Sequence, residues 1–458
     1  MVDYFGPVPG LWSWQQLAAV FDQQLLPGQR PEEVSRVVTD SRLVQPGDLF
    51  VALAGDPGSR FQPSHRSTVD GHSFVQQALA AGAVGALVDN TFVNAQVPEN
   101  RLLRVQNTYD GLWQLGRAAR QRYQGVVVAV TGSSGKTTAK TFLAHALRAY
   151  APPGSFNNHI GVPLTLANLP AQGRAAVVEI GTNHPGEIEP LAQMVKPDWA
   201  VLLNVHQAHI ENFENWQALK EEKLSIFNAL DDISHCIYED TLELGGGHSF
   251  GQSSGSRVQL RKLQGTSAEY VLDGETLTAT VPGGGMHRAL TVAATLLTCH
   301  LIGDGITRAT NLPQSLVPNG RGRLHQVADR VVVDDSYNAN PQSMAAGLEA
   351  ALALAHRGNA IAVVGEMLEL GDLGPAAHAG LVPLLQQFEQ VYCVGEAWRQ
   401  VASEIGAAWF ETAGEGLLQA LQDSPRHSLI VVKGSNRVFW AADFVPALLN
   451  RFQELQAS

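Results

Sequence analysis

The stretch GVVVAVTGSSGKTTAKTFLAHAL, residues 125–147, decides the fold of the central part of this chain. Its apolar run at 126–130 predicts a buried strand, and the run after the Gly/Ser turn predicts a helix over 136–150. Backbone N–H groups at the start of such a helix can surround phosphate oxygens, whose negative charge the helix dipole favours. A chance succession of strand, turn and helix is the alternative, but the spacing and the context both fit a loop that binds nucleotide phosphates.

The loop TGSSGKTT, residues 131–138, is a short variant of the general phosphate-binding pattern. The pattern G-x-x-x-x-G-K-[ST] would place glycine at position 130, where this chain has Val130. Lys136 is expected to reach the outer phosphates of ATP, and the Thr137 hydroxyl is expected to ligate Mg²⁺. The other loop residues predicted to contact ATP are Gly132, Ser133, Ser134, Gly135 and Thr138.

The regions around this loop alternate between strand-like and helix-like runs. The strand-like runs are 175–180, 199–205, 331–334, 360–365, 391–394 and 429–432, and the helix-like runs are 188–194, 213–230 and a run from 341. This rhythm predicts an α/β fold with mostly parallel sheets and helices on both faces. The length of 458 residues suggests about three domains. We place these domains at 1–107, 108–316 and 317–458.

The chain is acidic and carries few charges. Its formal net charge is −12, and 16% of its residues are charged, below the roughly 25% typical of soluble domains. This composition argues against non-specific binding to nucleic acid or to an anionic membrane surface. The N-terminus lacks the pattern of a signal peptide, and the apolar runs are far shorter than the ~20 residues of a membrane span. Cys236, Cys299 and Cys393 are far apart, which favours free thiols. We expect a soluble cytoplasmic protein and take it to be a monomer.

Polar side chains stand where other strands of the central region end. Ligands of open α/β sheets bind beyond these carboxyl ends. Glu179 ends the strand in AAVVEIG, and Asn204 and His209 follow the strand in WAVLLNV. A carboxylate at the end of a buried strand is costly without a partner, and Mg²⁺ prefers oxygen ligands, so Glu179 is a candidate metal ligand. A capping or solvated carboxylate is the alternative for Glu179, and an ordinary loop histidine is the alternative for His209.

Lys223 lies on the apolar face of the helix predicted over 213–230. The apolar residues of this face are Trp216, Leu219, Ile226, Phe227 and Leu230, and Lys223 fills the gap between Leu219 and Ile226. Glu221 and Glu222 are predicted to point elsewhere. A lysine on a buried face is unusual unless it is paired or functional, and a snorkelling lysine at the edge of the face is the alternative. A bare ammonium would repel Mg²⁺, whereas a lysine carbamate formed with CO₂ would supply oxygen ligands.

Motifs along the whole chain, in the right order, resemble those of the Mur ligase family. They are TDSRLVQPGDLFVAL (39–53), DGHSF (70–74), TGSSGKTT, SFNNHIGVPLT (155–165), EIGTNHPGEI (179–188), NVHQAHIENF (204–213), DDSYNANPQSM (334–344), VVGEMLELG (363–371) and VVKGS (431–435). The resemblance implies an N-terminal UDP-binding α/β domain, a central P-loop ATPase domain with a mostly parallel sheet, and a C-terminal Rossmann-like α/β domain.

The resemblance also implies an activity and a metal centre. The implied activity is an ATP-dependent ligation of D-alanyl-D-alanine to UDP-N-acetylmuramoyl-tripeptide, a step in peptidoglycan precursor synthesis. Two Mg²⁺ ions are implied beside Lys136, one held by Thr137 and Glu179 and the other by His209 and Lys223 as a carbamate.

Further contacts to ATP and to the other substrates follow from the same resemblance. The implied ATP contacts outside the loop are Asn204, His287, Asp335, Asn338 and an arginine that is either Arg321 or Arg323. The implied contacts to the UDP-linked tripeptide and the dipeptide are Ser41, Arg42, Asn157, Asn158, Asn183, His184, Asn340, Lys433 and Ser435.

Two stretches depart from the pattern of the family. On the adenine side, where the family has a His-Asn pair and a later Asn, this chain has Met286, His287 and Leu290. The stretch KGSNRVFW lacks the usual glycine after the motif at 433–436. A sibling ligase with another acceptor amine therefore stays open, as does a nucleotide-binding regulatory protein that does not ligate.

Overall fold

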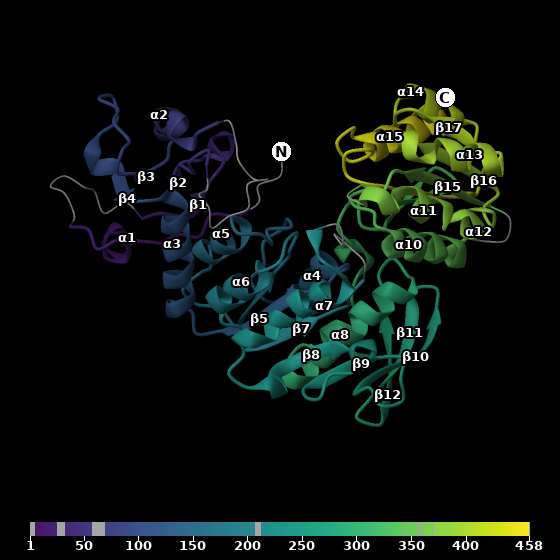
Figure 1. Ribbon diagram of the computed structural model, residues 1–458, viewed down its shortest axis with the longest axis horizontal. Helices are drawn as coiled ribbons and strands as arrows, with labels where there is room; N and C mark the ends of the chain where they lie inside the picture. Colours follow the sequence, from purple (N-terminus) through teal and green to yellow (C-terminus); the bar gives the residue numbers. More distant parts are fainter. Residues whose placement is uncertain are drawn as a thin grey trace. The chain divides into compact units, whose positions relative to one another are not determined.

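The computed structural model describes residues 5–24, 33–56, 69–206, 212–355, 359–368 and 370–457. The chain divides into two compact units. The first unit comprises Met1–Thr131, Arg148–Ala200 and Leu224–His235, and the second comprises Gly132–Leu147, Val201–Lys223 and Cys236–Ser458. Three sheets lie within residues 36–105, 126–280 and 323–433 (Figure 1). The domain boundaries at 107/108 and 316/317 stay a prediction.

A four-stranded parallel sheet lies in the first unit. Its order is β1-β2-β3-β4, with bounds Arg36–Val38, Asp48–Val51, Gly85–Asp89 and Leu102–Val105. Side chains of successive strand residues point to opposite faces. Accordingly, Leu49 packs in one apolar cluster with residues of α1 (Trp14–Val20) and α3 (Thr108–Arg122). Phe50 packs in another with residues of α2 (Val75–Ala80).

The second sheet has eight strands and carries the nucleotide loop. Its order is β12-β11-β10-β9-β8-β7-β5-β6. The bounds of β5 to β12 are Val126–Thr131, Ala175–Glu179, Trp199–Leu202, Cys236–Glu239, His248–Gly251, Val258–Gln264, Ser267–Leu272 and Glu275–Thr280. The outer pairs β10–β11 and β11–β12 are antiparallel, while β5 pairs with β6 in parallel. The predicted strand and helix on either side of the loop are therefore confirmed, the helix being α4 (Lys136–Leu147).

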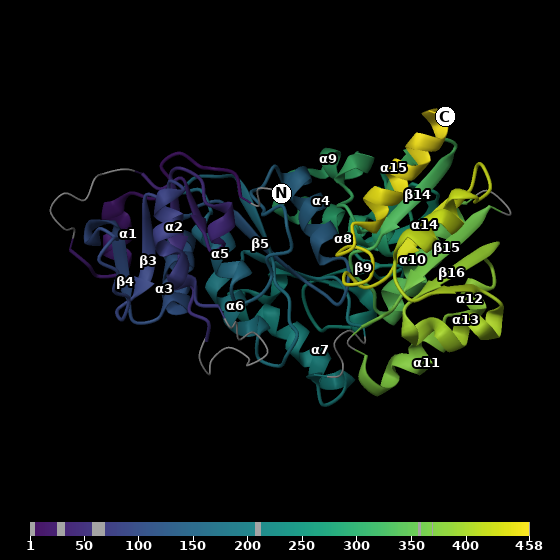
Figure 2. The same ribbon diagram turned by 90° about the horizontal axis from the view of Figure 1, so that it is seen from above.

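The third sheet has helices on both faces. Its order is β13-β14-β18-β15-β16-β17, with bounds Arg323–Val327, Arg330–Asp335, Leu429–Lys433, Ala360–Gly365, Gln390–Val394 and Ala408–Phe410. Only β13–β14 is antiparallel among the pairs of this sheet. One apolar cluster joins the sheet to α10 (Pro341–Leu354), and another joins it to α14 (Glu415–Gln422) and α15 (Phe444–Ala457) (Figure 2). The predicted α/β class with helices on both faces is confirmed here.

The helix predicted over 213–230 is shorter than expected. It is α7 (Trp216–Leu224), followed by a 3₁₀ turn over Ser225–Ala229. The Asn215 side chain accepts a hydrogen bond from the backbone N–H of Ala218, as an N-cap residue does, and this explains the later start. Trp216 is 41% exposed, so the apolar face begins only at Leu219. The prediction that Glu222 points away was wrong, because its side chain is buried beside Lys223.

Candidate active site

The nucleotide loop lies between the end of β5 and the start of α4. Gly135 has a φ of +78°, a left-handed conformation that a side chain would strain, so glycine suits the turn into the helix. The Lys136 ammonium donates a hydrogen bond of 2.8 Å to the carbonyl of Gly132 at the other end of the loop. Thr137 and Thr138 are buried in the first turn of α4. The loop is thus preformed around the place where the helix dipole would meet phosphate.

Asn204, which follows β7, braces this loop. Its side-chain oxygen accepts from the Ser134 backbone N–H at 2.9 Å, and its amide donates to the Ser134 carbonyl at 3.3 Å. The Asn204 carbonyl accepts from the Ser133 N–H at 3.0 Å, and the Ser133 hydroxyl bonds to the backbone of His206. Both polar groups of the Asn204 amide therefore bond to the loop, and its predicted contact to ATP stays a prediction.

Replacing Asn204 tests how much the hydrogen bonds of its side chain to the loop contribute to ATP binding and turnover. Asn204→Ala is expected to weaken ATP binding and to lower kcat by about 10- to 100-fold, the range for supporting groups that orient a site. Titration with ATP and a phosphate-release assay would measure the two effects. Asn311→Ala is the matched control, because the Asn311 amide also bonds to backbone and side-chain oxygens but lies at the end of α9 (Ile306–Thr310). Equal effects of the two substitutions would contradict a specific role.

Lys223 points inward, as its place on the helix predicts. Its side chain is only 2% exposed. Burial, the nearby ammonium of Lys136 and, in the opposite direction, the carboxylate of Glu222 together set the pKa of Lys223 to about 7, well below the usual 10.5. A substantial fraction of Lys223 is then a neutral amine at neutral pH. The snorkelling alternative is excluded, because the ammonium is not held in water at the edge of the apolar face.

Glu179 is a buried carboxylate in the first unit. It is 1% exposed, and one carboxylate oxygen accepts hydrogen bonds from the Ser155 hydroxyl at 2.9 Å and from the Asn157 amide at 2.8 Å. The alternative of a solvated carboxylate is therefore wrong. Asn157 bonds to Glu179 through its side chain and to the Gly181 N–H through its carbonyl, an arrangement that orients the carboxylate. Its predicted contact to a substrate remains untested.

The residues predicted to hold metal supply the right donor atoms. Glu179 and Thr137 offer a carboxylate and a hydroxyl, which are oxygen ligands of the kind that Mg²⁺ takes together with substrate phosphates. His209 lies outside the described residues. Among the described residues, no group of three or more His, Cys, Asp or Glu side chains is close enough to hold a metal without other ligands.

A second set of predicted residues meets at the ends of β14 and β18. Lys433 donates to the Asp335 carboxylate at 2.7 Å and to the carbonyl of Asn338 at 3.4 Å. Although burial raises it, the charges of Lys433 and Arg288 hold the pKa of Asp335 below its usual value. His287, at the start of α8 (Met286–Ile302), lies near this pair, and burial above all lowers its pKa to about 3. The imidazole is therefore neutral at neutral pH.

The two candidate arginines differ in their surroundings. The Arg321 guanidinium lies 4.4 Å from the centre of the Tyr337 ring, and the backbone carbonyl of Arg321 accepts a hydrogen bond from Arg288. Arg323 donates to the Asn319 side chain at 2.6 Å. Which of the two contacts phosphate stays open, but the carbonyl of Arg321 is bonded to α8 through Arg288.

Several predicted substrate residues organise the backbone around them. Asn158 accepts from two N–H groups at the start of α5 (Gly161–Ala167), and Asn340 caps α10. The N–H groups of Asn183 and His184 donate to the Glu187 carboxylate. Ser435 is buried just after β18. These side chains shape loops, and their substrate contacts stay predictions.

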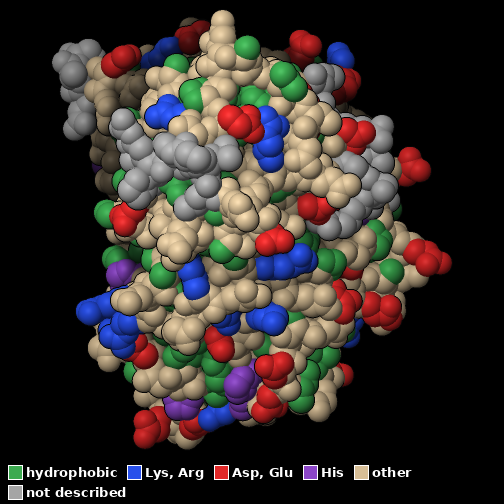
Figure 3. Space-filling view, turned by 90° about the vertical axis from the view of Figure 1, so that its left-hand side faces the viewer, with side chains coloured by type: hydrophobic (Ala, Val, Ile, Leu, Met, Phe, Trp, Pro, Cys, Tyr) green, Lys and Arg blue, Asp and Glu red, His purple; other side chains and the backbone are tan. Residues whose placement is uncertain are grey.

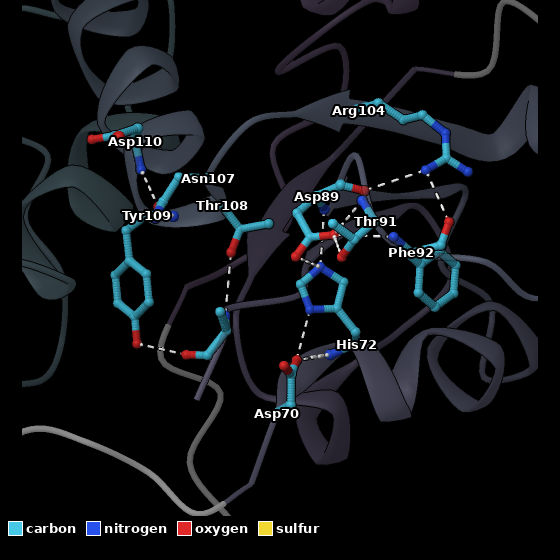
Figure 4. Close-up of polar contacts among 11 residues, drawn as sticks. Asp70, His72, Asp89, Thr91, Phe92, Arg104, Asn107, Thr108, Tyr109 and Asp110 are labelled. Carbon is cyan, nitrogen blue, oxygen red and sulfur yellow. Dashed lines mark hydrogen bonds and ion pairs between the residues drawn. The ribbon is translucent and has the colours of Figure 1, made fainter. Parts of the chain in front are cut away.

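The end of the four-stranded sheet contains the predicted Ser41–Arg42 pair. Ser41 begins a short 3₁₀ turn capped by Asp40, and the 79% exposed Arg42 guanidinium pairs with the Asp40 carboxylate at 2.6 Å. Tyr109 and Thr108, at the start of α3, bond to the backbone of Ala54 after β2 (Figure 4).

Sequence reasoning missed His72 as a residue of this sheet end. Figure 4 shows its ring between Asp70 and Asp89, with Nδ1 2.6 Å from the Asp70 carboxylate. Its Nε2 accepts the Asp89 backbone N–H at 2.9 Å, which requires the tautomer protonated on Nδ1. The sequence did contain a signal for His72, because this residue is the central one of the motif DGHSF, residues 70–74. The ring ties the turn at 70–74 to the end of β3.

A cavity of about 580 Å³ opens beside the edge strand β4. Arg104 lines it, but its guanidinium is already paired with Glu99 and bonded to the carbonyls of Asp89 and Phe92. None of the predicted site residues lines this cavity. It is therefore distinct from the candidate site.

Figure 3 shows acidic and basic side chains scattered over the described residues of that face. In the part of the chain that the structure describes, no helix has the length and apolar character needed to cross a membrane.

Comparison with known proteins places these motifs in a family. Residues 130–295 match the Mur ligase middle domain, and residues 320–436 match the Mur ligase, glutamate ligase domain. A protein of Rickettsia prowazekii named UDP-N-acetylmuramoyl-tripeptide--D-alanyl-D-alanine ligase is 30% identical over 88% of this chain and 93% of its own length. A Bacillus subtilis protein of the same name is 31% identical over 87% of this chain and 90% of its own length.

Solved structures agree with the sequence relatives. MurF from Acinetobacter baumannii superimposes with a TM-score of 0.78 at 28% identity, covering 98% of this chain and 100% of that one. MurF from Thermotoga maritima in complex with ADP gives a TM-score of 0.75 at 27% identity, covering 92% and 98%. Loop, fold and relatives lead to one conclusion: the chain belongs to the Mur ligase family.

Proposed function

We propose that this protein is an ATP-dependent ligase that joins D-alanyl-D-alanine to UDP-N-acetylmuramoyl-tripeptide. The sequence relatives carry that activity in their names, and they match nearly the whole chain. The observation that carries the proposal is buried Lys223 beside Lys136 of the nucleotide loop. A protein that only binds nucleotide has no need of a second buried lysine there, which disfavours the regulatory alternative.

The proposed reaction has two steps. The terminal carboxylate of the tripeptide attacks the γ-phosphorus of ATP, the bond to the β–γ bridging oxygen breaks, and an acyl phosphate and ADP form. The amine of the dipeptide then attacks the acyl carbon, so that an amide forms while phosphate and a proton leave. Lys136 stabilises the charge that develops on the phosphoryl oxygens, because it is already positioned at the loop.

Two Mg²⁺ ions would neutralise further phosphate charge when bound. We assign Thr137 and Glu179 to one ion, and His209 and Lys223 to the other. Lys223 would serve as a carbamate, since its neutral amine can attack CO₂ and lose a proton to give an oxygen-donor anion. Its burial and lowered pKa support this assignment.

The roles of the other residues belong to the same proposal. Ser41 and Arg42 would face the uridine nucleotide, whereas Asp335, Asn338 and Arg321 or Arg323 would face ATP. A cytoplasmic location fits an enzyme that consumes ATP and a UDP-linked precursor. Because these residues come from different predicted domains, domain closure would gate turnover.

Phosphate release tests the assignment directly. The protein with ATP, Mg²⁺, UDP-N-acetylmuramoyl-tripeptide and D-alanyl-D-alanine is expected to release phosphate at a steady rate, and omission of either substrate is expected to abolish it. Offering a diamino acid with the UDP-linked dipeptide precursor distinguishes a sibling ligase. Equal release without any acceptor, or binding of ATP without product, would overturn the proposed ligation.

A further inference from the structure

Arg288 is a buried cation that the proposed reaction does not use. It lies in the first turn of α8, and its side chain is only 3% exposed. Its guanidinium donates three hydrogen bonds, to the carbonyls of Gly283 at 3.0 Å, Gly284 at 2.9 Å and Arg321 at 2.9 Å. Burial lowers the pKa of Arg288, while the Asp335 charge opposes that shift. A buried arginine bonded to carbonyl oxygens needs a reason, because desolvating a charge is costly.

One of these carbonyls belongs to the segment 318–322, here called the linker. The linker precedes β13 and is bonded to the end of β14 on its other side. The Gly320 N–H donates to the Asp334 carboxylate at 2.7 Å, and the Gly322 N–H donates to the Asp334 carbonyl at 2.6 Å. The Tyr337 N–H donates to the Gly320 carbonyl at 2.9 Å. The linker is thus fastened to the third sheet, and Arg288 fastens it to α8.

The space around the guanidinium excludes side chains. A Cβ atom added to Gly322 would lie 1.6 Å from Nη2 of Arg288, and one added to Gly283 would lie 3.2 Å from its Cζ. Both glycines also have a positive φ, +83° and +75°. The linker can therefore approach α8 only because glycine stands where the guanidinium passes.

The same helix also lies close to the nucleotide loop. A Cβ atom on Gly135 would lie 3.5 Å from the Thr291 hydroxyl, and Thr291 follows Arg288 by three residues, on the same side of α8. One face of the first turns of α8 therefore faces the nucleotide loop at Thr291 and bonds to the linker at Arg288. Arg321, whose carbonyl accepts the hydrogen bond from Arg288, is one of the two arginines proposed to contact phosphate.

We propose that Arg288 is a positioning residue for the ligation reaction. Its guanidinium fastens the linker to α8 and so sets where Arg321 and the Asp334–Asp335 strand end stand relative to the nucleotide loop. The expected fall in kcat rests on the proposed ligase activity. The attachment of the linker to α8 does not depend on that activity. Nothing in the role requires Arg288 to touch ATP or the UDP-linked substrate.

The first test separates positioning from binding. Arg288→Ala is expected to lower kcat by about 10- to 100-fold, the cost of misplacing reacting groups by about 1 Å. The KM for the UDP-linked tripeptide is expected to stay unchanged, because none of the three residues whose carbonyls Arg288 holds is among its predicted contacts. Arg288→Lys is expected to restore part of kcat. Arg308→Ala is the matched control, since the Arg308 guanidinium also donates to a carbonyl, that of Ala146, and pairs with Asp304.

Hydrogen exchange supplies a readout that needs no substrate. The amides of Gly320, Gly322 and Tyr337 are expected to exchange faster in Arg288→Ala and to keep their rate in Arg308→Ala. A wild-type chain without ligase activity would refute the proposed function and leave this measurement intact. Unchanged exchange together with unchanged kcat in Arg288→Ala would overturn the positioning role.

A double substitution isolates the contact itself. Gly322→Ala is expected to lower kcat as much as Arg288→Ala does, because its methyl must displace the guanidinium. In the Arg288→Ala background, Gly322→Ala is expected to lower kcat by no more than Gly303→Ala lowers it in the wild type. Gly303 is the matched control, with a φ of +77° and nothing within 4 Å of an added Cβ. If the effects of Arg288→Ala and Gly322→Ala on kcat were additive in the double variant, the contact between the two residues would be refuted. If Arg288→Ala does not fold, the kcat values of Arg288→Lys and Gly322→Ala can be compared in its place.

Discussion

Lys223→Ala should fold normally and lose nearly all ligase activity. We expect kcat to fall by about 10²- to 10³-fold, the range for removing one preorganised group that stabilises transition-state charge. The physical reason is that the substitution removes the proposed oxygen-donor anion from a buried position beside Lys136. A short carboxylic acid such as formate should restore part of the activity, since it can occupy the vacated space and supply carboxylate oxygens. Steady-state phosphate release with and without the acid measures both effects.

The pH dependence adds an internal check on the carbamate. The pKa of Lys223, about 7, lies below its ordinary value, so the amine that reacts with CO₂ predominates above pH 7 and is lost as the pH falls through 7. Added bicarbonate should therefore raise wild-type activity most near and above pH 7. Lys220→Ala is the control on the same helix, because Lys220 lies over the Trp216 ring, 5.4 Å from its centre. Wild-type activity in Lys223→Ala, or no effect of any carboxylic acid, would end the carbamate proposal.

Lys136→Ala should lose nearly all turnover while the protein keeps its fold. The ammonium of Lys136 is the cation that the structure places within the nucleotide loop, where it bonds to the Gly132 carbonyl. Without it, the charge that develops on the transferred phosphoryl group loses its preorganised partner, and we expect kcat to fall by about 10²- to 10³-fold. ATP titration and phosphate release measure binding and turnover separately.

A surface lysine serves as the control for this substitution. Lys262 lies exposed on β10, within the same unit as the loop, so Lys262→Ala changes the net charge equally without touching the loop. Thermal unfolding of both variants should match the wild type. If Lys136→Ala retained turnover, the phosphate-binding loop would have to lie elsewhere in the chain.

Much of the candidate site could be predicted from local patterns. The strand, Gly/Ser turn and helix over 125–147 stand where the sequence indicates, and Lys223 points inward as the spacing of its apolar neighbours requires. Both features depend on residues within one or two turns of each other, where backbone geometry dictates direction. The failure at Glu222 has a different cause. Glu222 stands three residues after Leu219 and four before Ile226, so helical spacing itself places it beside the apolar face, and its charge was given too much weight.

The sequence by itself determined the α/β class, the nucleotide loop and the family to which the chain belongs. Only the tertiary structure decided how the loop is braced and how the linker is held. Asn204 bonds to Ser134 across 70 positions of the chain, Arg288 bonds to Arg321 across 33, and Lys433 pairs with Asp335 across 98. The burial that shifts the pKa of Lys223 likewise comes from packing. Such contacts depend on which distant segments meet when the chain buries its apolar surface. The local periodicity of the sequence does not show which segments these are.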